Sequence, residues 1–145
     1  MDAAGVARKA GVVAKAIELH GPEFDDPLDA LRRMGGLELA AIGGAVLAAR
    51  MARVPVILDG FACCAAAAVL HRLDPSALDH CIVGHRSVEP GHALLLDAIG
   101  KTPVLDLGLR LGEASGAATA LLVLRAAIAC HTGMATFAEA AVSQS

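Results

Sequence analysis

The stretch VPVILDGFACCAAAAVL (Val54–Leu70) joins two kinds of predicted secondary structure. Its first residues, Val54–Asp59, form a short apolar run of the kind found in strands. Asp59 and Gly60 interrupt this run, and the alanine-rich segment that begins at Phe61 is typical of a helix. A strand that leads through a tight turn into a helix is the first half of a βαβ unit, so this stretch points to an α/β fold.

The same alternation recurs twice further along the chain. CIVG (Cys81–Gly84) and PVLDL (Pro103–Leu107) are short apolar runs that predict strands. Helices are predicted between and after the strands, at Phe61–Leu73, Pro90–Ile99 and Glu113–His131. Strands that are apolar throughout fit a sheet covered on both faces. The sequence therefore predicts a Rossmann-like parallel sheet of about three strands with flanking helices.

The remaining segments are predicted to be mainly helical. Helices are expected at residues 5–20, from Pro27 until Gly35 and Gly36 break it, and at residues 37–52, with a last helix at Met134–Val142. We divide the single domain into a helical part (1–52), an α/β core (53–131) and a C-terminal helix (132–145). A helix ahead of the first strand would normally follow a strand of its own, and three strands leave two exposed edges. We therefore expect this sheet to be part of a larger one.

Composition excludes several classes of function. The 145 residues carry a net charge of −3 and are 56% hydrophobic but only 2% aromatic, so nucleic-acid binding is not expected. No uninterrupted apolar run reaches the roughly 20 residues of a membrane span, and the first residues do not follow a signal-peptide layout. The four cysteines form no CxxC pair, which fits buried thiols in a reducing cytoplasm. The alanine-rich helices suit contacts with another chain.

Polar residues cluster where each predicted strand ends. The three segments are Asp59–Phe61, Gly84–His92 and Asp106–Ala117. Ligands of open α/β sheets bind at the carboxyl ends of the strands. We therefore expect these three segments to meet at one edge and to form the functional site.

The segment GHRSVEPGH (Gly84–His92) allows three interpretations. A metal site would use His85, Glu89 and His92, but Pro90 interrupts any helix that could align them, and no metal is expected. A glycine-containing loop with Arg86 and Ser87 suits a phosphate. Capping of the next helix by Ser87 or Glu89 explains the same residues, and the residues alone do not separate these last two interpretations.

Two acids also have alternative interpretations. Asp59 could bind a hydroxyl group, although a turn with Gly60 is favoured on spacing alone. Glu113 would be stabilised near the positive end of the helix dipole, which explains an acid there but not the neighbouring Gly112 and Ser115. Free N–H groups near Ala114–Gly116 could hold a phosphate or a carboxylate.

Three long motifs resemble one enzyme family. GGLELAAIGGAVLAARMARVPVILDGF, GHRSVEPGH and LDLGLRLGEASGAA are similar to segments of nicotinate-nucleotide–dimethylbenzimidazole phosphoribosyltransferases, and the closing MATFAEAAVS is similar to the C-terminus of that family. The resemblance runs from about Gly5 to Ser143 and covers only the later part of the family's longer chain. The preceding part of family members helps to form the dimethylbenzimidazole pocket. The family usually has glycine where this chain has Ala114.

The resemblance implies a cytoplasmic enzyme of cobalamin synthesis. It would transfer the phosphoribosyl group of nicotinate mononucleotide to dimethylbenzimidazole without a cofactor or metal. Glu113 would be the general base and lie in a pocket. The substrate-binding residues would be Asp59, Gly60, Gly84, His85, Arg86, Ser87, Leu111, Gly112, Ser115 and Gly116. The partner would be a second copy or a separate N-terminal half, and the alternative is a truncated or split relative that binds nucleotide or assembles with a partner without independent turnover.

Overall fold

The computed structural model describes residues 2–21 and 25–141 and contains one parallel sheet. Its strands are β1 (Val56–Leu58), β2 (Cys81–His85) and β3 (Pro103–Leu105), in the spatial order β1-β2-β3. The registers pair Val56 with Cys81 and Val83 with Pro103. The prediction of an α/β fold with about three parallel strands is therefore confirmed.

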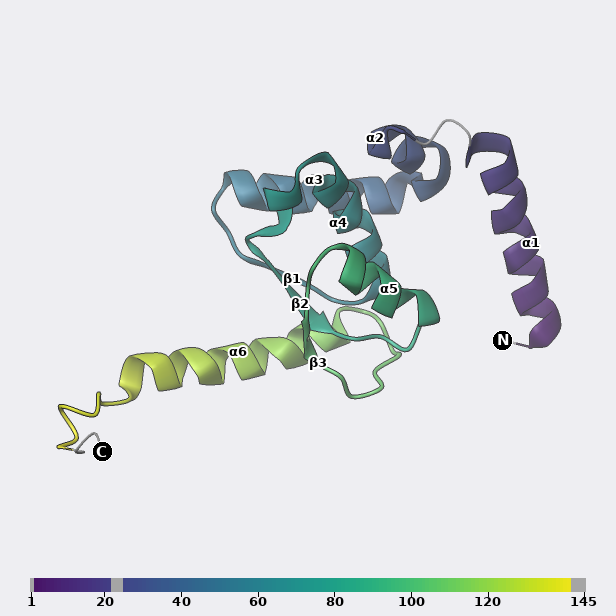
Figure 1. Cartoon of the computed structure of the whole chain (residues 1–145). Helices are drawn as coiled ribbons and strands as arrows, with labels where there is room; N and C mark the ends of the chain where they lie inside the picture. Colours follow the sequence, from purple (N-terminus) through teal and green to yellow (C-terminus); the bar gives the residue numbers. More distant parts are fainter. Residues whose placement is uncertain (1, 22–24, 142–145) are drawn as a thin grey trace.

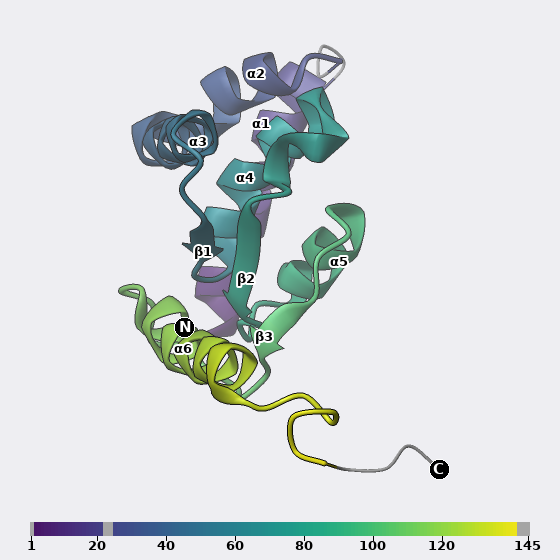
Figure 2. The same cartoon turned by 90° about the vertical axis from the view of Figure 1, so that its left-hand side faces the viewer.

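Helices cover both faces of the sheet (Figures 1 and 2). Helices α4 (Phe61–Leu73) and α5 (Pro90–Ala98) lie on one face, and the first half of α6 (Ser115–Gly133) crosses the other. Helix α3 (Gly36–Met51) packs on the outside of α4. This arrangement explains why the strands lack an alternating polar pattern, since both of their faces meet helices.

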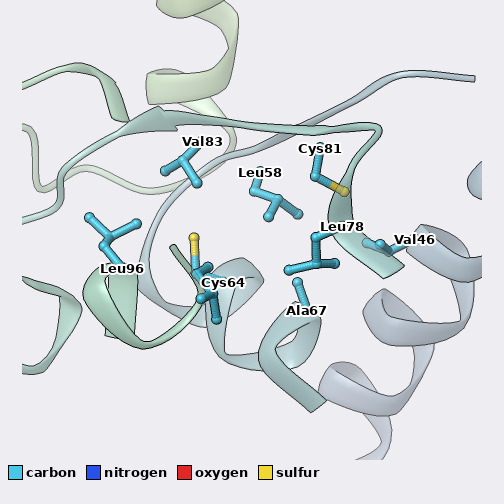
Figure 3. Close-up of a cluster of buried hydrophobic side chains, with 9 residues drawn as sticks. Val46, Leu58, Cys64, Ala67, Leu78, Cys81, Val83 and Leu96 are labelled. Carbon is cyan, nitrogen blue, oxygen red and sulfur yellow. The ribbon is translucent and has the colours of Figure 1, made fainter. Parts of the chain in front are cut away.

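The main core lies between the sheet and α4 (Figure 3). Leu58 and Val83 of the strands pack against Cys64 of α4, and all three are almost fully buried. Burial raises the pKa of the Cys64 thiol to about 12, so the thiol stays protonated and packs as a small apolar side chain. All four cysteines are free thiols.

The segment before α3 is more continuous than predicted. Helix α2 (Pro27–Ala30) runs into a π-helical turn, η2 (Leu31–Gly35), and then directly into α3. The predicted break is confined to Gly36, which has φ +76°. A Cβ on Gly35 would overlap the end of the Leu31 side chain, so a larger residue there would require that side chain to shift.

The predicted helix at Met134–Val142 is wrong for the residues that the structure describes. Residues 134–136 have no regular structure, residues 137–141 form a turn, and Val142 lies outside the described residues. Thr136 and Glu139 exchange the hydrogen bonds of a capping box, yet Ala141 has φ +54° and ends the turn. A short helix with no tertiary contacts rarely persists, which explains why the capping signal is not followed by a helix.

A 3₁₀ turn, η3 (Pro75–Leu78), was not predicted.

Long helices extend beyond the core. Helix α1 (Ala3–His20) stands away from the sheet, and the C-terminal half of α6 projects past it (Figure 1). The helical stretches Pro27–Met51 and Ser115–Gly133 are long and apolar enough to cross a membrane by length and composition. The sequence test missed them because it required an uninterrupted apolar run. Core helices of water-soluble proteins meet the same criterion, so the absence of a membrane segment stays a prediction.

Candidate functional site

The carboxyl ends of β1 and β2 meet the loop before α6 around an open pocket of about 260 Å³. Its lining combines the ends of two strands with the glycine-rich loop, and it consists of Asp59, Gly60, Phe61, Ala62, Cys63, His85, Ser87, Glu89, Arg110, Leu111 and Gly112. This is the edge at which open α/β sheets bind ligands. The pocket therefore coincides with the place that the strand order predicted.

Asp59 connects β1 to the start of α6. Its carboxylate Oδ1 accepts a hydrogen bond of 2.8 Å from the backbone N–H of Ala117, in the first turn of that helix. The first N–H groups of a helix have no partner inside it, so an acceptor supplied from another element caps the helix. Asp59 thus supplies an acceptor at the start of α6, where the helix dipole was one of two interpretations of Glu113.

His85 fills the space between β1 and α6. Its side chain is only 3% exposed, and its Nδ1 lies 3.7 Å from Asp59 Oδ1 without a hydrogen-bond partner. A Cβ on Gly60 would lie 2.9 Å from His85 Cε1, and a Cβ on Gly116 would overlap the ring. The two glycines therefore make room for the imidazole at the rear of the pocket.

Ser87 is held by a second histidine. The Ser87 N–H donates to His92 Nδ1 over 3.0 Å, and the Ser87 Oγ lies 2.8 Å from the same nitrogen. His92 is fully buried in the first turn of α5, with its ring tilted against Phe61. A buried pair thus fixes the loop that follows β2.

The charged groups of the pocket are mixed in sign. Asp59 and Glu89 contribute carboxylates, and Arg110 contributes a guanidinium. A hydrogen bond from Ser87 lowers the pKa of Glu89, so this carboxylate is ionised at neutral pH. Carboxylates accept hydrogen bonds from hydroxyl groups, whereas a guanidinium and free N–H groups bind anions. The pocket therefore suits a ligand that carries both hydroxyl groups and an anionic group.

The loop before α6 has an unusual backbone. Gly112, Glu113 and Ala114 are consecutive left-handed residues, with φ values of +81°, +56° and +59°. Helix α6 therefore begins at Ser115, not at Glu113 as predicted. The Glu113 side chain is exposed and does not line the pocket, so its predicted location in a pocket is wrong for this chain. Glu113 nevertheless directly follows Gly112, which does line it.

The structure brings together six of the predicted site residues, namely Asp59, Gly60, His85, Ser87, Leu111 and Gly112. Arg86 points elsewhere, because its guanidinium lies 3.5 Å from the Asp106 carboxylate beside a second cavity. Gly84 and Gly116 serve packing, since a Cβ on Gly84 would lie 3.0 Å from the Ala117 backbone. Ser115 begins α6 outside the pocket lining.

Sequence reasoning missed several lining residues, among them Phe61, Cys63 and Arg110. Phe61 and Cys63 follow the turn after β1 and looked like ordinary helix residues. Arg110 had a usable signal, because it is the one basic residue in the loop between β3 and α6. Within residues 2–21 and 25–141, no group of three His, Cys, Asp or Glu side chains could hold a metal ion.

Comparison with known proteins gives the family. A family model described as phosphoribosyltransferase matches residues 1–142. The chain belongs to this phosphoribosyltransferase family. Its resemblance to nicotinate-nucleotide–dimethylbenzimidazole enzymes is also supported by similar curated proteins of that name. One from Rhizobium leguminosarum is 58% identical over 136 residues, and one from Methylocella silvestris is 56% identical over 143 residues.

A solved structure supports the same family fold. The crystal structure of nicotinate-nucleotide–dimethylbenzimidazole phosphoribosyltransferase from Thermus thermophilus matches with a TM-score of 0.89 and 44% sequence identity. The match covers 99% of this chain but 43% of that structure. The Rhizobium and Methylocella relatives are covered to 40% and 42% of their length. This phosphoribosyltransferase chain therefore spans about two fifths of the relatives that it matches.

Proposed function

We propose that this chain takes part in the transfer of the phosphoribosyl group of nicotinate mononucleotide to 5,6-dimethylbenzimidazole. The observation that carries the proposal is the pocket at the carboxyl ends of β1 and β2, in a chain of the phosphoribosyltransferase family. The products would be α-ribazole 5′-phosphate and nicotinate, as in the assembly of the cobalamin nucleotide loop.

The mixed charge of the pocket supports a sugar phosphate as ligand. The Asp59 and Glu89 carboxylates are available as acceptors for ribose hydroxyl groups. The Ser87 hydroxyl, the Arg110 guanidinium and the loop at Gly112 supply donors for the phosphate. His85, Gly60 and Leu111 were predicted to bind substrate, and in this proposal they do so as walls of the pocket.

Glu113 is proposed as the general base. A nitrogen of dimethylbenzimidazole attacks C1′ of the ribose, and the bond from C1′ to the nicotinate nitrogen breaks. The new bond makes the attacking base cationic, so its remaining N–H proton must leave, and a carboxylate within hydrogen-bond reach accepts it. Asp59 already caps α6, so Glu113 is not needed for that purpose. The exposed position of Glu113 next to the pocket leaves it open to a second substrate.

The proposed partner completes the site. Since the chain spans about two fifths of its relatives, we propose that it works with a polypeptide equivalent to their preceding part, or as a homodimer. Apolar side chains exposed on α6 support such a contact, among them Leu121, Leu122 and Ile128. Free thiols at all four cysteines fit action in the reducing cytoplasm.

An activity assay tests the proposal. The purified chain is incubated with nicotinate mononucleotide and dimethylbenzimidazole, alone and together with the part of the Rhizobium relative that precedes the match. Formation of α-ribazole 5′-phosphate in either mixture is expected, and its absence in both would overturn the transferase function. Glu113→Gln should abolish turnover while nicotinate mononucleotide still binds, because the amide does not accept a proton.

A second candidate is a binding or assembly subunit without turnover of its own. The exposed Glu113 and the short span of the chain favour it. Nicotinate mononucleotide binding by the chain alone, with product formed only when the preceding part is added, would establish this split arrangement. Product formation by the chain alone would exclude it.

A further inference from the structure

We propose that His92 is a positioning residue that fixes Ser87 for anion binding through its Nδ1 atom. The inference rests on the proposed function for the identity of the ligand, a phosphate monoester. His92 does not line the pocket, and it touches two residues that do, through a hydrogen bond to Ser87 and a ring contact with Phe61.

The geometry defines which nitrogen of His92 carries its proton. The Ser87 N–H donates to Nδ1, so Nδ1 must be an acceptor, and the proton of the neutral ring resides on Nε2. Protonation of Nδ1 would place two donors opposite each other and break this bond. His92 must therefore remain neutral to hold the loop after β2.

The same bond means that the Ser87 hydroxyl does not need to donate to His92. The Oγ lies 2.8 Å from His92 Nδ1, but the backbone N–H already uses that lone pair. Ser87 also forms a hydrogen bond with Glu89 at the pocket wall. The hydroxyl proton is therefore donated to the ionised Glu89 carboxylate in the ligand-free chain, and it must turn away from this strong acceptor to reach a bound anion.

His92 is not explained by packing alone. The ring is fully buried, and its Nε2 has no hydrogen-bond partner among the described residues. A buried polar atom without a partner destabilises a fold, so an apolar residue of similar size would suit the contact with Phe61 better. The acceptor at Nδ1 is the property that only a few side chains could supply.

The surroundings of His92 keep it neutral. Burial is the main cause of its lowered pKa, and the facing His85 and Arg86 act in the same direction, whereas Glu89 opposes them. The aromatic ring of Phe61 covers another side without contributing a charge. The Ser87–His92 bond should therefore persist at neutral pH and open under acid conditions.

The first measurement uses the ligand-free chain labelled with ¹⁵N. The ring-nitrogen shifts of His92 should report the Nε2–H tautomer, and the Ser87 amide should show a scalar coupling to Nδ1 across the hydrogen bond. A protonated Nδ1 at neutral pH, or no coupling to Ser87, would overturn the inference.

The second measurement compares affinities for nicotinate mononucleotide and for inorganic phosphate by calorimetry. His92→Phe keeps a ring but removes the acceptor, so about tenfold weaker binding is expected, as for the loss of one hydrogen bond. His92→Asn places an oxygen near the position of Nδ1 and should restore most of the affinity. His71 lies in α4 outside the pocket and, like His92, has one ring nitrogen without a hydrogen-bond partner, so His71→Phe should bind like the unchanged chain.

The outcomes separate the two proposals. Equal affinity of His92→Phe, His92→Asn and the unchanged chain would show that His92 has only a structural role. If the unchanged chain binds neither nicotinate mononucleotide nor phosphate, the proposed function fails, and the amide coupling alone then decides whether His92 positions Ser87.

Discussion

Ala114 is one of the residues with a side chain that adopt a left-handed backbone conformation. It has φ +59° and ψ +15°, directly after Glu113, which is also left-handed. A left-handed conformation costs an L-residue with a Cβ roughly 1–2 kcal/mol, whereas glycine adopts it freely. Because this conformation lets α6 begin after Glu113, the strain is located where the proposed base is positioned.

Ala114→Gly should therefore stabilise the chain. We expect the free energy of unfolding to rise by about 0.5–1 kcal/mol, since relief of the strain exceeds the extra entropy of glycine in the unfolded chain. Urea unfolding followed by circular dichroism measures it. Ala118→Gly is the matched control, and it should lower stability by about 1 kcal/mol because Ala118 is an exposed residue inside α6. A loss of stability in Ala114→Gly would contradict the argument.

The lowered pKa of His92 predicts how stability depends on pH. The unfolded chain holds this proton near pH 6.5, whereas the folded chain releases it at a lower pH because the ring is buried. The unfolded state then binds more protons in this range, so the stabilising contribution is complete above pH 6.5 and is lost as the pH falls below it.

Unfolding free energies at pH 7.5 and pH 5.5 check this expectation. The chain should be less stable at pH 5.5, and His92→Asn, which does not titrate, should show a smaller difference. An unchanged pH dependence in His92→Asn would assign the effect to other groups.

A site residue could be predicted from the sequence only where its position directly after a strand is enough to place it. Ser87 follows β2 and supplies a hydroxyl donor, and Gly112 follows β3 and adopts a positive φ. Both line the pocket, as expected. The bond from Asp59 to Ala117 was not predictable, because the two residues are far apart in sequence and meet only through sheet and helix packing. Arg86 was expected in the same site as Ser87, but its guanidinium lies 3.5 Å from the Asp106 carboxylate and lines a different cavity.

At the level of elements, the strands and helices were recognised because each is a short, chemically uniform run. Helix α4 begins and ends as predicted, at Phe61 and Leu73. The predicted helix boundaries are wrong mainly at helix ends, because tertiary contacts determine where a helix stops. Helix α6 starts two residues later than predicted, and the described segment after Gly133 forms no helix. Neither the left-handed loop nor the missing packing partner leaves a periodic pattern in the sequence.

The contact between β2 and α6 should be intolerant of added volume. Gly116→Ala would place a methyl group inside the His85 ring, so a loss of about 1–3 kcal/mol of unfolding free energy is expected. Gly133→Ala, in the last turn of the same helix with open space around it, should cost far less. Thermal unfolding of both variants measures the two losses of stability. Equal losses would contradict the argument that the His85 ring excludes a side chain at position 116.

Across the whole molecule, one face of the sheet is only partly covered. An apolar groove of about 570 Å³ lies between β1, β2 and α6, with Ile57, Ile82 and Leu121 among its lining residues. Apolar side chains also lie exposed further along α6, among them Leu122 and Ile128, and contiguous apolar surface is typical of interaction sites. The sequence predicted contacts to another chain from composition, but it did not indicate which surface would make them.

Self-association of the isolated chain follows from that groove. Sedimentation velocity at increasing concentration should show species larger than the 14.6 kDa monomer. Leu121→Glu should reduce them, because a charge in the groove must otherwise be desolvated. Thr119→Glu, an exposed position on the same helix, should not. A monomer at all concentrations would leave the groove without a role in association between copies.

The bond between Asp59 and Ala117 joins the pocket wall to a helix 58 residues later. Such a loop closes only when the intervening sheet has formed, so the pocket should be among the last parts to assemble during folding. A ligand that binds there recognises the completed fold and not a local fragment. At a free concentration one hundred times its dissociation constant, it would stabilise the entire chain by about 2.7 kcal/mol. Protection of amides in α3, which does not line the pocket, against hydrogen exchange would then report occupancy of the pocket.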